Sequence, residues 1–173
     1  MSHRQHRRSG PVSVTCAVVT VSDTRTVAND RSGRLIRAAL ERDGHAVVDD
    51  GIVKDDPRRL RTHLAAIRRR GMARVVVMTG GTGVAPRDRT FEAVEALFEK
   101  RLPGFGELFR MLSYRQVGSA AMLSRATAGL WRGMVVFSLP GSPRAVRLAM
   151  RRLILPELRH VAGLLGPARG RRA

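Results

Sequence analysis

The segment RVVVMTGGTG, residues 74–83, is the strongest indication of the fold class of this 173-residue chain. Its first half is a continuous apolar run, which is typical of a strand buried on both faces of a parallel sheet. Its second half, Thr79–Gly83, has three glycines in four positions, so its backbone N–H groups can approach an anion closely. A tight structural turn is the other interpretation of these glycines. The first interpretation predicts a phosphate-binding loop at the end of a strand.

Strand-like and helix-like segments alternate on both sides of this stretch. The alternation predicts an α/β fold, with three α/β/α layers around a mostly parallel central sheet in a single domain. Apolar runs predict the strands, and apolar residues spaced three and four apart predict the helices. Residues 103–113 are predicted to form a turn and a short helix, while 120–128 fit neither pattern clearly. The predicted strands are 12–21, 45–53, 74–78 and 135–139, and the predicted helices are 32–42, 57–69, 90–100, 144–154 and a last one from Pro156.

Composition is that of a globular protein, with 43% hydrophobic and 27% charged residues. We expect one domain over residues 12–165, flanked by disordered basic tails at 1–11 and 166–173. No apolar run approaches the roughly 20 residues that cross a bilayer, and no signal peptide is evident. Cys16 is the only cysteine and lies in an apolar segment, so we expect a buried side chain. These features favour a cytoplasmic protein without membrane contact.

The formal net charge of +18 suggests either an anionic partner or simply a basic solvated surface. Aromatic residues make up only 4% of the chain, and no nucleic-acid-binding motif is visible. We therefore expect no specific nucleic acid partner. Weak binding by the arginine-rich tails would fall steeply with salt.

Several predicted strands end in small, polar or acidic residues that suit a ligand crevice better than a core. Asp88 lies five residues beyond Gly83, and a carboxylate beside a phosphate loop suggests Mg²⁺. Asp88 could instead pair with Arg87 or Arg89, or cap a helix at Thr90. A second carboxylate could come from Asp23, Asp55 or Asp56, although each alone fits a turn or a helix N-terminus. Ser142 and Pro143 similarly fit the start of a helix.

Six segments, in this order, resemble the MogA/MoaB family of molybdenum-cofactor biosynthesis proteins over roughly residues 12–165. The combination of TGGTG, a following Arg-Asp-x-Thr and PGFGE is highly specific. Lys54 is a departure, because the family has proline before its acidic pair. The segments are VSDTRT (21–26), DRSGRLIRAAL (30–40), TGGTGVAPRDRT (79–90), PGFGELFR (103–110), SRATAG (124–129) and LPGSPRAV (139–146).

The resemblance implies a molybdopterin adenylyltransferase, with molybdopterin and ATP as substrates and Mg²⁺ as cofactor. Such an enzyme transfers AMP from ATP to the terminal phosphate of molybdopterin and releases pyrophosphate. By the match of motifs, Asp88 and Asp55 are the expected catalytic and metal-binding residues. The expected binding residues are Ser22, Asp23, Thr79, Gly80, Gly81, Thr82, Gly83, Glu107 and Ser142.

The resemblance also implies a homotrimer or hexamer and a downstream molybdate-insertion protein as partner. The apolar residues of 105–112 are a weak hint of self-association, although such clusters more often belong to a core. Some members of the family have weak or no adenylylation activity. The alternative function is therefore a catalytically silent molybdopterin-binding or carrier homologue.

Overall fold

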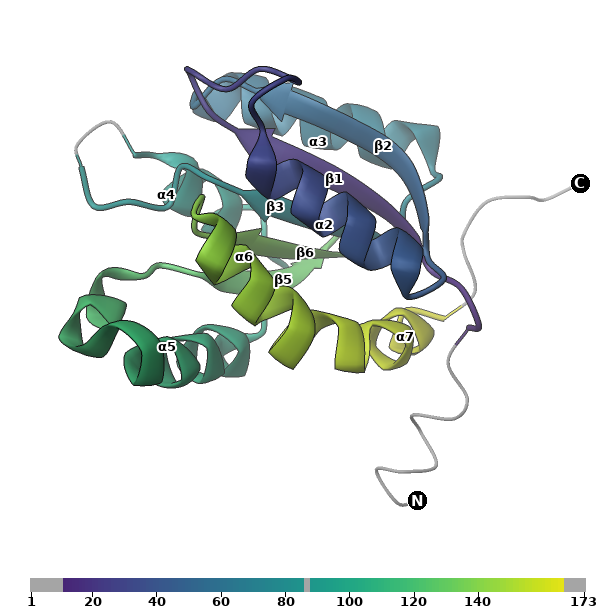
Figure 1. Cartoon of the computed structure of the whole chain (residues 1–173). Helices are drawn as coiled ribbons and strands as arrows, with labels where there is room; N and C mark the ends of the chain where they lie inside the picture. The colour runs from purple at the N-terminus through teal and green to yellow at the C-terminus, as the bar shows by residue number, and fades with distance from the viewer. Residues whose placement is uncertain (1–10, 86–87, 167–173) are drawn as a thin grey trace, which may run out of the picture.

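A six-stranded sheet in the order β2-β1-β3-β6-β5-β4 runs through the part of this computed structural model that is described, residues 11–85 and 88–166 (Figure 1). Strands β1, β2, β3 and β6 are parallel, and β5 and β4 pair antiparallel at one side. The predicted α/β fold with a mostly parallel sheet is confirmed. The strands are β1 Thr15–Val21, β2 Ala46–Val53, β3 Val75–Thr79, β4 Lys100–Arg101, β5 Thr127–Trp131 and β6 Met134–Leu139.

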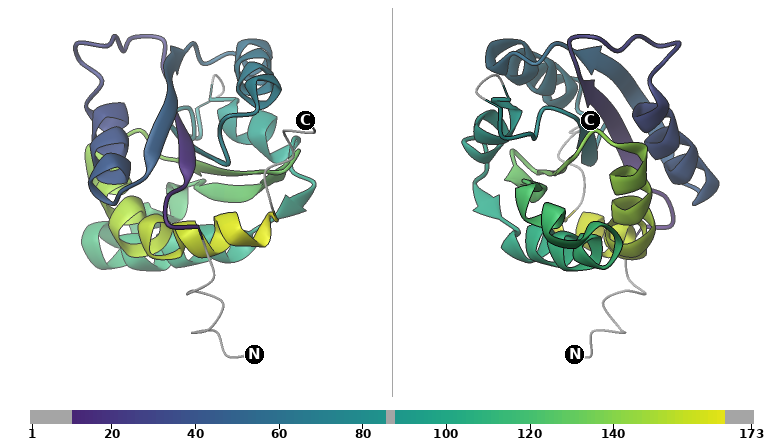
Figure 2. Two further views of the ribbon diagram at one scale, coloured as in Figure 1. Left: turned by 90° about the vertical axis from the view of Figure 1, so that its right-hand side faces the viewer. Right: turned by 60° about the vertical axis from the view of Figure 1, so that its left-hand side comes forward.

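Helices cover both faces of the sheet, which gives the three layers (Figure 2). On one face α2, α5, α6 and α7 share a core with Cys16, Val18, Val75 and Val77. On the other face α3 and α4 pack on the alternate strand residues, such as Val19. The helices are α2 Arg31–Arg42, α3 Pro57–Arg70, α4 Thr90–Glu95, α5 Pro103–Val117, α6 Pro143–Ala149 and α7 Leu155–Leu164, with a 3₁₀ segment η1 at Gly118–Leu123 and a π-helical segment η2 at Met150–Ile154.

The predicted helix over 90–100 is too long. It ends at Glu95, because the chain then turns so that the Glu99 N–H donates to the Leu130 carbonyl at 2.9 Å and opens β4. Leu97 and Phe98 continue the apolar pattern, but they pack under the sheet from the turn. A side chain on Gly129 of β5 would overlap the Phe98 ring, so the glycine makes room for it.

Strand β5 begins within residues 120–128, which fitted neither the strand pattern nor the helix pattern, and it extends beyond them to Trp131. It joins β6 through a two-residue hairpin at Arg132 and Gly133, whose φ angles are 47° and 79°. Two positive φ angles in succession mark a type I′ turn, which matches the twist of paired strands. The usual Asn-Gly signal of that turn is missing here.

Two helix boundaries also differ from the predictions. The short helix within 103–113 is α5, which continues to Val117. The predicted break before Pro156 does not occur, because η2 carries the helix from α6 directly into α7. Pro156 lies just after the end of η2, and a π-helical turn is one of the places where the ordinary i→i−4 hydrogen-bond ladder of a helix is interrupted.

The predicted basic tails lie almost entirely outside the described residues. In residues 11–85 and 88–166, no helix is both long enough and apolar enough to cross a membrane. Cys16 is fully buried, as expected, and burial raises the pKa of its thiol to about 12.

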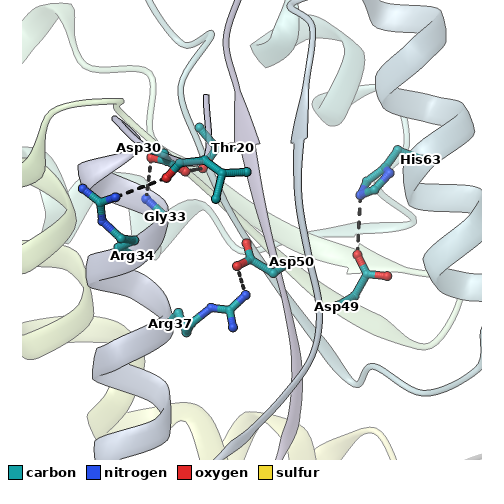
Figure 3. A network of polar contacts seen from close by, with 9 residues as sticks. Thr20, Asp30, Gly33, Arg34, Arg37, Asp49, Asp50 and His63 are labelled. Carbon is teal, nitrogen blue, oxygen red and sulfur yellow. Dashed lines mark hydrogen bonds and ion pairs between the residues drawn. The ribbon is translucent and has the colours of Figure 1, made fainter. Parts of the chain in front are cut away.

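Two histidines are held neutral by their surroundings. His45 is buried just before β2, where its Nδ1 accepts from the Val14 N–H at 3.2 Å and its Nε2 lies 3.0 Å from Asp43. His63 reaches from α3 toward Asp49 of β2 (Figure 3), with 3.6 Å between Nε2 and Oδ1. Burial lowers the pKa of both imidazoles below the ordinary 6.5, and this outweighs the neighbouring carboxylates.

We predict that acid destabilises the fold through these two groups. The unfolded chain takes up protons near pH 6.5 that folded His45 and His63 do not. Stability is therefore complete above pH 6.5 and falls below it, by up to about 1.4 kcal/mol per pH unit for each histidine. Urea unfolding at several pH values between 5 and 7.5 measures the slope. His45→Gln should make the slope shallower, and an unchanged slope would contradict this assignment.

Candidate functional site

The four parallel strands end at one edge of the sheet because their registers align. Val21 lies opposite Val53, and Thr79 lies opposite both Thr20 and Leu139. The loops that follow these strands therefore meet, as the sequence predicted. They are Ser22–Thr24 after β1, Lys54–Asp56 after β2, Gly80–Gly83 after β3 and Pro140–Ser142 after β6.

Asp23 and Lys54 connect the loops after β1 and β2. The Lys54 ammonium donates to the Asp23 carbonyl at 2.6 Å, and the Asp55 N–H donates to the Asp23 carboxylate at 3.2 Å. Ser22 shapes its own turn, since its hydroxyl accepts from the Thr24 and Arg25 N–H groups. Lys54, the departure from the family pattern, thus helps to fix the backbone that presents Asp55.

The three glycines of the loop after β3 are packed against protein rather than open space. A side chain on Gly80 would collide with the Val21 carbonyl, one on Gly81 with Thr90, and one on Gly83 with the Asp88 carboxylate. Gly80 and Gly81 also have positive φ angles, 101° and 63°. The tight-turn interpretation therefore explains why these positions are glycine: the turn leaves no room for a side chain.

The backbone N–H groups of this loop differ in whether the protein supplies an acceptor for them. The Gly80 N–H donates to the Leu139 carbonyl at 3.0 Å. Within the described residues, no protein group accepts from the N–H groups of Gly81, Thr82 and Gly83. Three successive backbone donors without protein acceptors suit an anion such as phosphate. The packing and binding interpretations of this loop are thus compatible.

Three clefts border this loop. The apolar cleft, of about 460 Å³, lies between Gly80–Gly83 and the walls formed by α5, η1 and the start of α6. The hydroxyl cleft, of about 580 Å³, has Thr20, Ser22, Ser32 and Thr79 in its lining. Gly80 and Gly141 line both, so these two clefts adjoin. The arginine cleft, of about 510 Å³, has Asp88, Glu92, Arg61, Arg89 and Arg125 in its lining.

Asp30 orders one wall of the hydroxyl cleft (Figure 3). It is the N-cap of α2 and accepts from the Gly33 N–H at 2.9 Å. Its other oxygen accepts from the Thr20 hydroxyl at 2.6 Å. Ser32, next in this wall, donates to the Gly141 carbonyl at 2.8 Å. These bonds fasten the start of α2 to the ends of β1 and β6.

The two acidic residues assigned to metal binding lie along the glycine loop. Asp55 lies against Gly81 and accepts from the Thr90 hydroxyl at 2.7 Å. Asp88 lies against Gly83 and accepts from the Ala85 N–H at 3.0 Å. Asp88 does not cap α4, whose N-cap position is Arg89, and no ion pair joins Asp88 to Arg89 in the described structure. Arg87, the other suggested partner, lies outside the described residues.

Asp55 and Asp88 are the carboxylates beside the glycine loop that could hold a magnesium ion together with a phosphate ligand. No group of three His, Cys, Asp or Glu side chains able to hold a metal occurs in residues 11–85 and 88–166. Mg²⁺ commonly uses only one or two carboxylates together with substrate phosphates. Asp55 and Asp88, on either side of three backbone donors, provide such a set. Asp56 plays a different part, since it caps α3 by accepting from the Arg59 N–H at 2.8 Å.

Of the other predicted binding residues, Ser142, Thr79 and Thr82 line the clefts beside the loop, whereas Glu107 does not. Ser142 caps α6 by accepting from the Ala145 N–H at 3.2 Å, and it also lines the apolar cleft. The buried Thr79 hydroxyl donates to the Pro140 carbonyl at 3.0 Å, while Thr82 lines the apolar cleft. Glu107 is exposed on α5 and lines none of the three clefts.

Arg125 organises the loop and was not singled out from the sequence. Its guanidinium donates to the carbonyls of Thr82, Gly83 and Asp88, at 3.2 Å to Thr82 and 3.0 Å to Asp88. It also pairs with Glu92 and lies 4.8 Å from the Phe91 ring centroid. The pKa of Glu92 is lowered by its own backbone N–H and by Arg125. The sequence signal that could have pointed to Arg125 was its place in SRATAG (124–129), one of the segments that resemble the family.

We predict that Arg125→Ala loosens the loop at a cost of about 2 kcal/mol, because hydrogen bonds from a charged donor are each worth about 1.5–3 kcal/mol before solvent screening. Amides of residues 80–92 should then exchange faster with solvent. Arg101→Ala is the matched control, since Arg101 makes an exposed ion pair with Glu95 at 2.7 Å, away from the loop. It should cost about 0.5 kcal/mol or less. Equal exchange in both variants would remove Arg125 from this role.

Known proteins with similar sequences and structures agree with the resemblance. Residues 17–160 match the family described as "Probable molybdopterin binding domain". Molybdenum cofactor biosynthesis protein B of Halalkalibacterium halodurans is 49% identical over 162 residues, 93% of this chain and 95% of that protein. The protein of the same name from Bacillus subtilis is 51% identical over the same shares.

Solved structures give the same result. A crystal structure of molybdenum cofactor biosynthesis protein B superimposes with a TM-score of 0.87 and 51% identity, covering 90% of this chain and 97% of the other. The tungsten cofactor synthesizing protein MoaB of Pyrococcus furiosus superimposes with a TM-score of 0.78 and 41% identity, covering 92% and 99%. With these matches over nearly its whole described length, the chain belongs to the MogA/MoaB family of molybdenum-cofactor biosynthesis proteins.

Proposed function

We propose that this protein binds molybdopterin and transfers AMP from Mg-ATP to its terminal phosphate, releasing pyrophosphate. The main support for this proposal is the glycine loop, whose backbone donors are flanked by the carboxylates of Asp55 and Asp88. Nucleotidyl transfer depends on positioning and charge neutralisation more than on a protein nucleophile. Two adjoining clefts that meet at Gly80 and Gly141 allow two substrates to face each other there.

Each part of the site has a definite task in this reaction. The N–H groups of Gly81, Thr82 and Gly83 hold phosphate oxygens, and the apolar cleft with Phe109 and Leu148 in its lining offers a surface for the pterin ring. Asp88 and Asp55 would hold Mg²⁺, which neutralises the triphosphate when bound. Ser22 and Asp23 fix the loop that presents Asp55.

The decisive experiment is incubation of the full chain with molybdopterin, ATP and Mg²⁺, with pyrophosphate release as the readout. Release that requires molybdopterin supports the transferase. Tight molybdopterin binding without any release supports the alternative, a catalytically silent carrier that serves a downstream molybdate-insertion protein. Absence of molybdopterin binding would contradict both functions.

We further propose that the chain forms a homotrimer or hexamer. Of the apolar residues in 105–112, Phe109 is buried in the core, and Phe105 and Leu112 pack against that core. Leu108 and Met111 are about half exposed on α5, at 47% and 49%. Tyr114, Val117, Met122 and Leu123 extend this exposed apolar surface over α5 and η1.

Light scattering at micromolar concentration tests the assembly. We expect a mass of three or six chains of 19.0 kDa. Leu108→Glu combined with Met111→Glu should lower the mass if this surface is an interface, because burying two carboxylates is costly. A monomeric mass for the unmodified chain would refute the proposal.

A further inference from the structure

Two arginines of the arginine cleft have no partner within residues 11–85 and 88–166. Arg61 comes from α3 and Arg89 from the N-cap position of α4, and both side chains are exposed to the cleft. Neither makes a hydrogen bond or an ion pair with any residue in 11–85 or 88–166. Arg125, the third guanidinium, is already engaged by the loop carbonyls and Glu92. Two arginines without a partner among the described residues therefore line the same cleft as Asp88 and Glu92.

The cleft also adjoins the proposed reaction centre. Asp88 lines it and at the same time lies against Gly83 of the glycine loop. An anion in the cleft would thus continue from a phosphate held at the loop, past the carboxylate assigned to Mg²⁺. The guanidinium fork matches the oxygen spacing of phosphate, which makes arginine the preferred residue for such contacts.

The lining favours a compact anion over a base or a pterin ring as the occupant. Its apolar members are small or aliphatic, Pro57, Val84, Ala85 and Ala93, and none offers an aromatic face. The nearby Phe91 ring is covered by the Arg125 guanidinium. A compact, strongly charged ligand fits these walls better than a planar one.

We propose that the arginine cleft is the subsite for the β- and γ-phosphates of the nucleotide and for the pyrophosphate that leaves, with Arg61 and Arg89 as its ligands. This assignment rests on the proposed adenylyl transfer for its role in the reaction. An oxygen of the molybdopterin terminal phosphate attacks the α-phosphorus of ATP and forms a new P–O bond. The bond from the α-phosphorus to the α,β-bridging oxygen breaks, and its electron pair leaves with pyrophosphate. Arg61 and Arg89 stabilise the charge that gathers there.

The test compares binding of inorganic pyrophosphate and of AMP, each with Mg²⁺, by titration calorimetry on the full chain. Arg61→Ala and Arg89→Ala should each weaken pyrophosphate binding about tenfold, and the double variant about a hundredfold. AMP has no β-phosphate, so its affinity should change less than about twofold. The matched control is Arg58→Ala with Arg69→Ala, which removes the same charge from exposed positions of α3 outside the cleft.

The outcomes separate this inference from the proposed function. Loss of pyrophosphate affinity in the cleft variant but not in the control supports the subsite, whether or not turnover is detected. Equal losses in both variants would show a general charge effect and overturn it, as would a wild-type chain that binds no pyrophosphate at millimolar concentration. Failure of adenylyl transfer alone is scored in the separate release assay with molybdopterin.

Discussion

Asp88→Asn is expected to reduce adenylyl transfer about a hundredfold or more while leaving molybdopterin binding intact. An amide keeps the shape of the carboxylate but not the charge that holds Mg²⁺. Losing about 3 kcal/mol of transition-state stabilisation corresponds to two powers of ten in rate. The asparagine oxygen can still accept from the Ala85 N–H, so the loop should keep its conformation. The measurement is turnover, alongside thermal stability and molybdopterin affinity.

Asp56→Asn is the matched control for this experiment. It makes the same chemical change in another acidic residue near the site, but Asp56 caps α3 and asparagine is an equally good cap. Activity and stability should therefore stay close to wild type. If Asp88→Asn behaved like this control, Asp88 would have only a structural role in the loop. The metal assignment would then pass to Asp55 or Asp23.

Gly80→Ala is expected to lower the free energy of unfolding by about 3 kcal/mol or more. Alanine is strained at a φ of 101°, and its Cβ would collide with the Val21 carbonyl, a backbone atom inside the sheet. For a chain of this size, the melting temperature should drop by about 6–12 °C. Thermal unfolding followed by circular dichroism measures the effect.

Gly71→Ala separates the strain from the collision. Gly71 ends α3 with a φ of 66°, and nothing lies within 4 Å of an added Cβ. Only the left-handed backbone is penalised there, at about 1 kcal/mol, so the melting temperature should fall by about 2–4 °C. Similar losses in the two variants would mean that the β1–β3 contact yields easily, contrary to our expectation.

The meeting of the strand ends could be predicted because it depends on long apolar runs. Val75–Met78 and Val135–Leu139 are buried on both faces, and parallel strands of that kind place their following loops together. The caps at Asp56 and Ser142 follow equally local rules, since each precedes a proline that begins a helix.

Features that depend on tertiary contacts were not predictable. Leu97 and Phe98 continue the apolar spacing of a helix, and the sequence therefore predicts a longer one. In the structure they follow the end of α4 and reach the core from a turn. Strand β5 has only five residues and contains Gly129, so its alternation of apolar and polar residues is weak. The packing of Gly83 against Asp88 joins residues whose contact no periodicity reveals.

The antiparallel direction of β5 has a further consequence. The chain enters β5 at the edge where β1, β2, β3 and β6 end, so Arg125, just before the strand, arrives beside the glycine loop. The position of Arg125 along that edge is fixed by the Arg132–Gly133 hairpin at the opposite end of the sheet. One residue added to that turn would shift the strand by about 3.4 Å and turn its side chains to the other face. The position of the glycine loop's Arg125 contacts thus depends on a hairpin at the opposite end of the sheet.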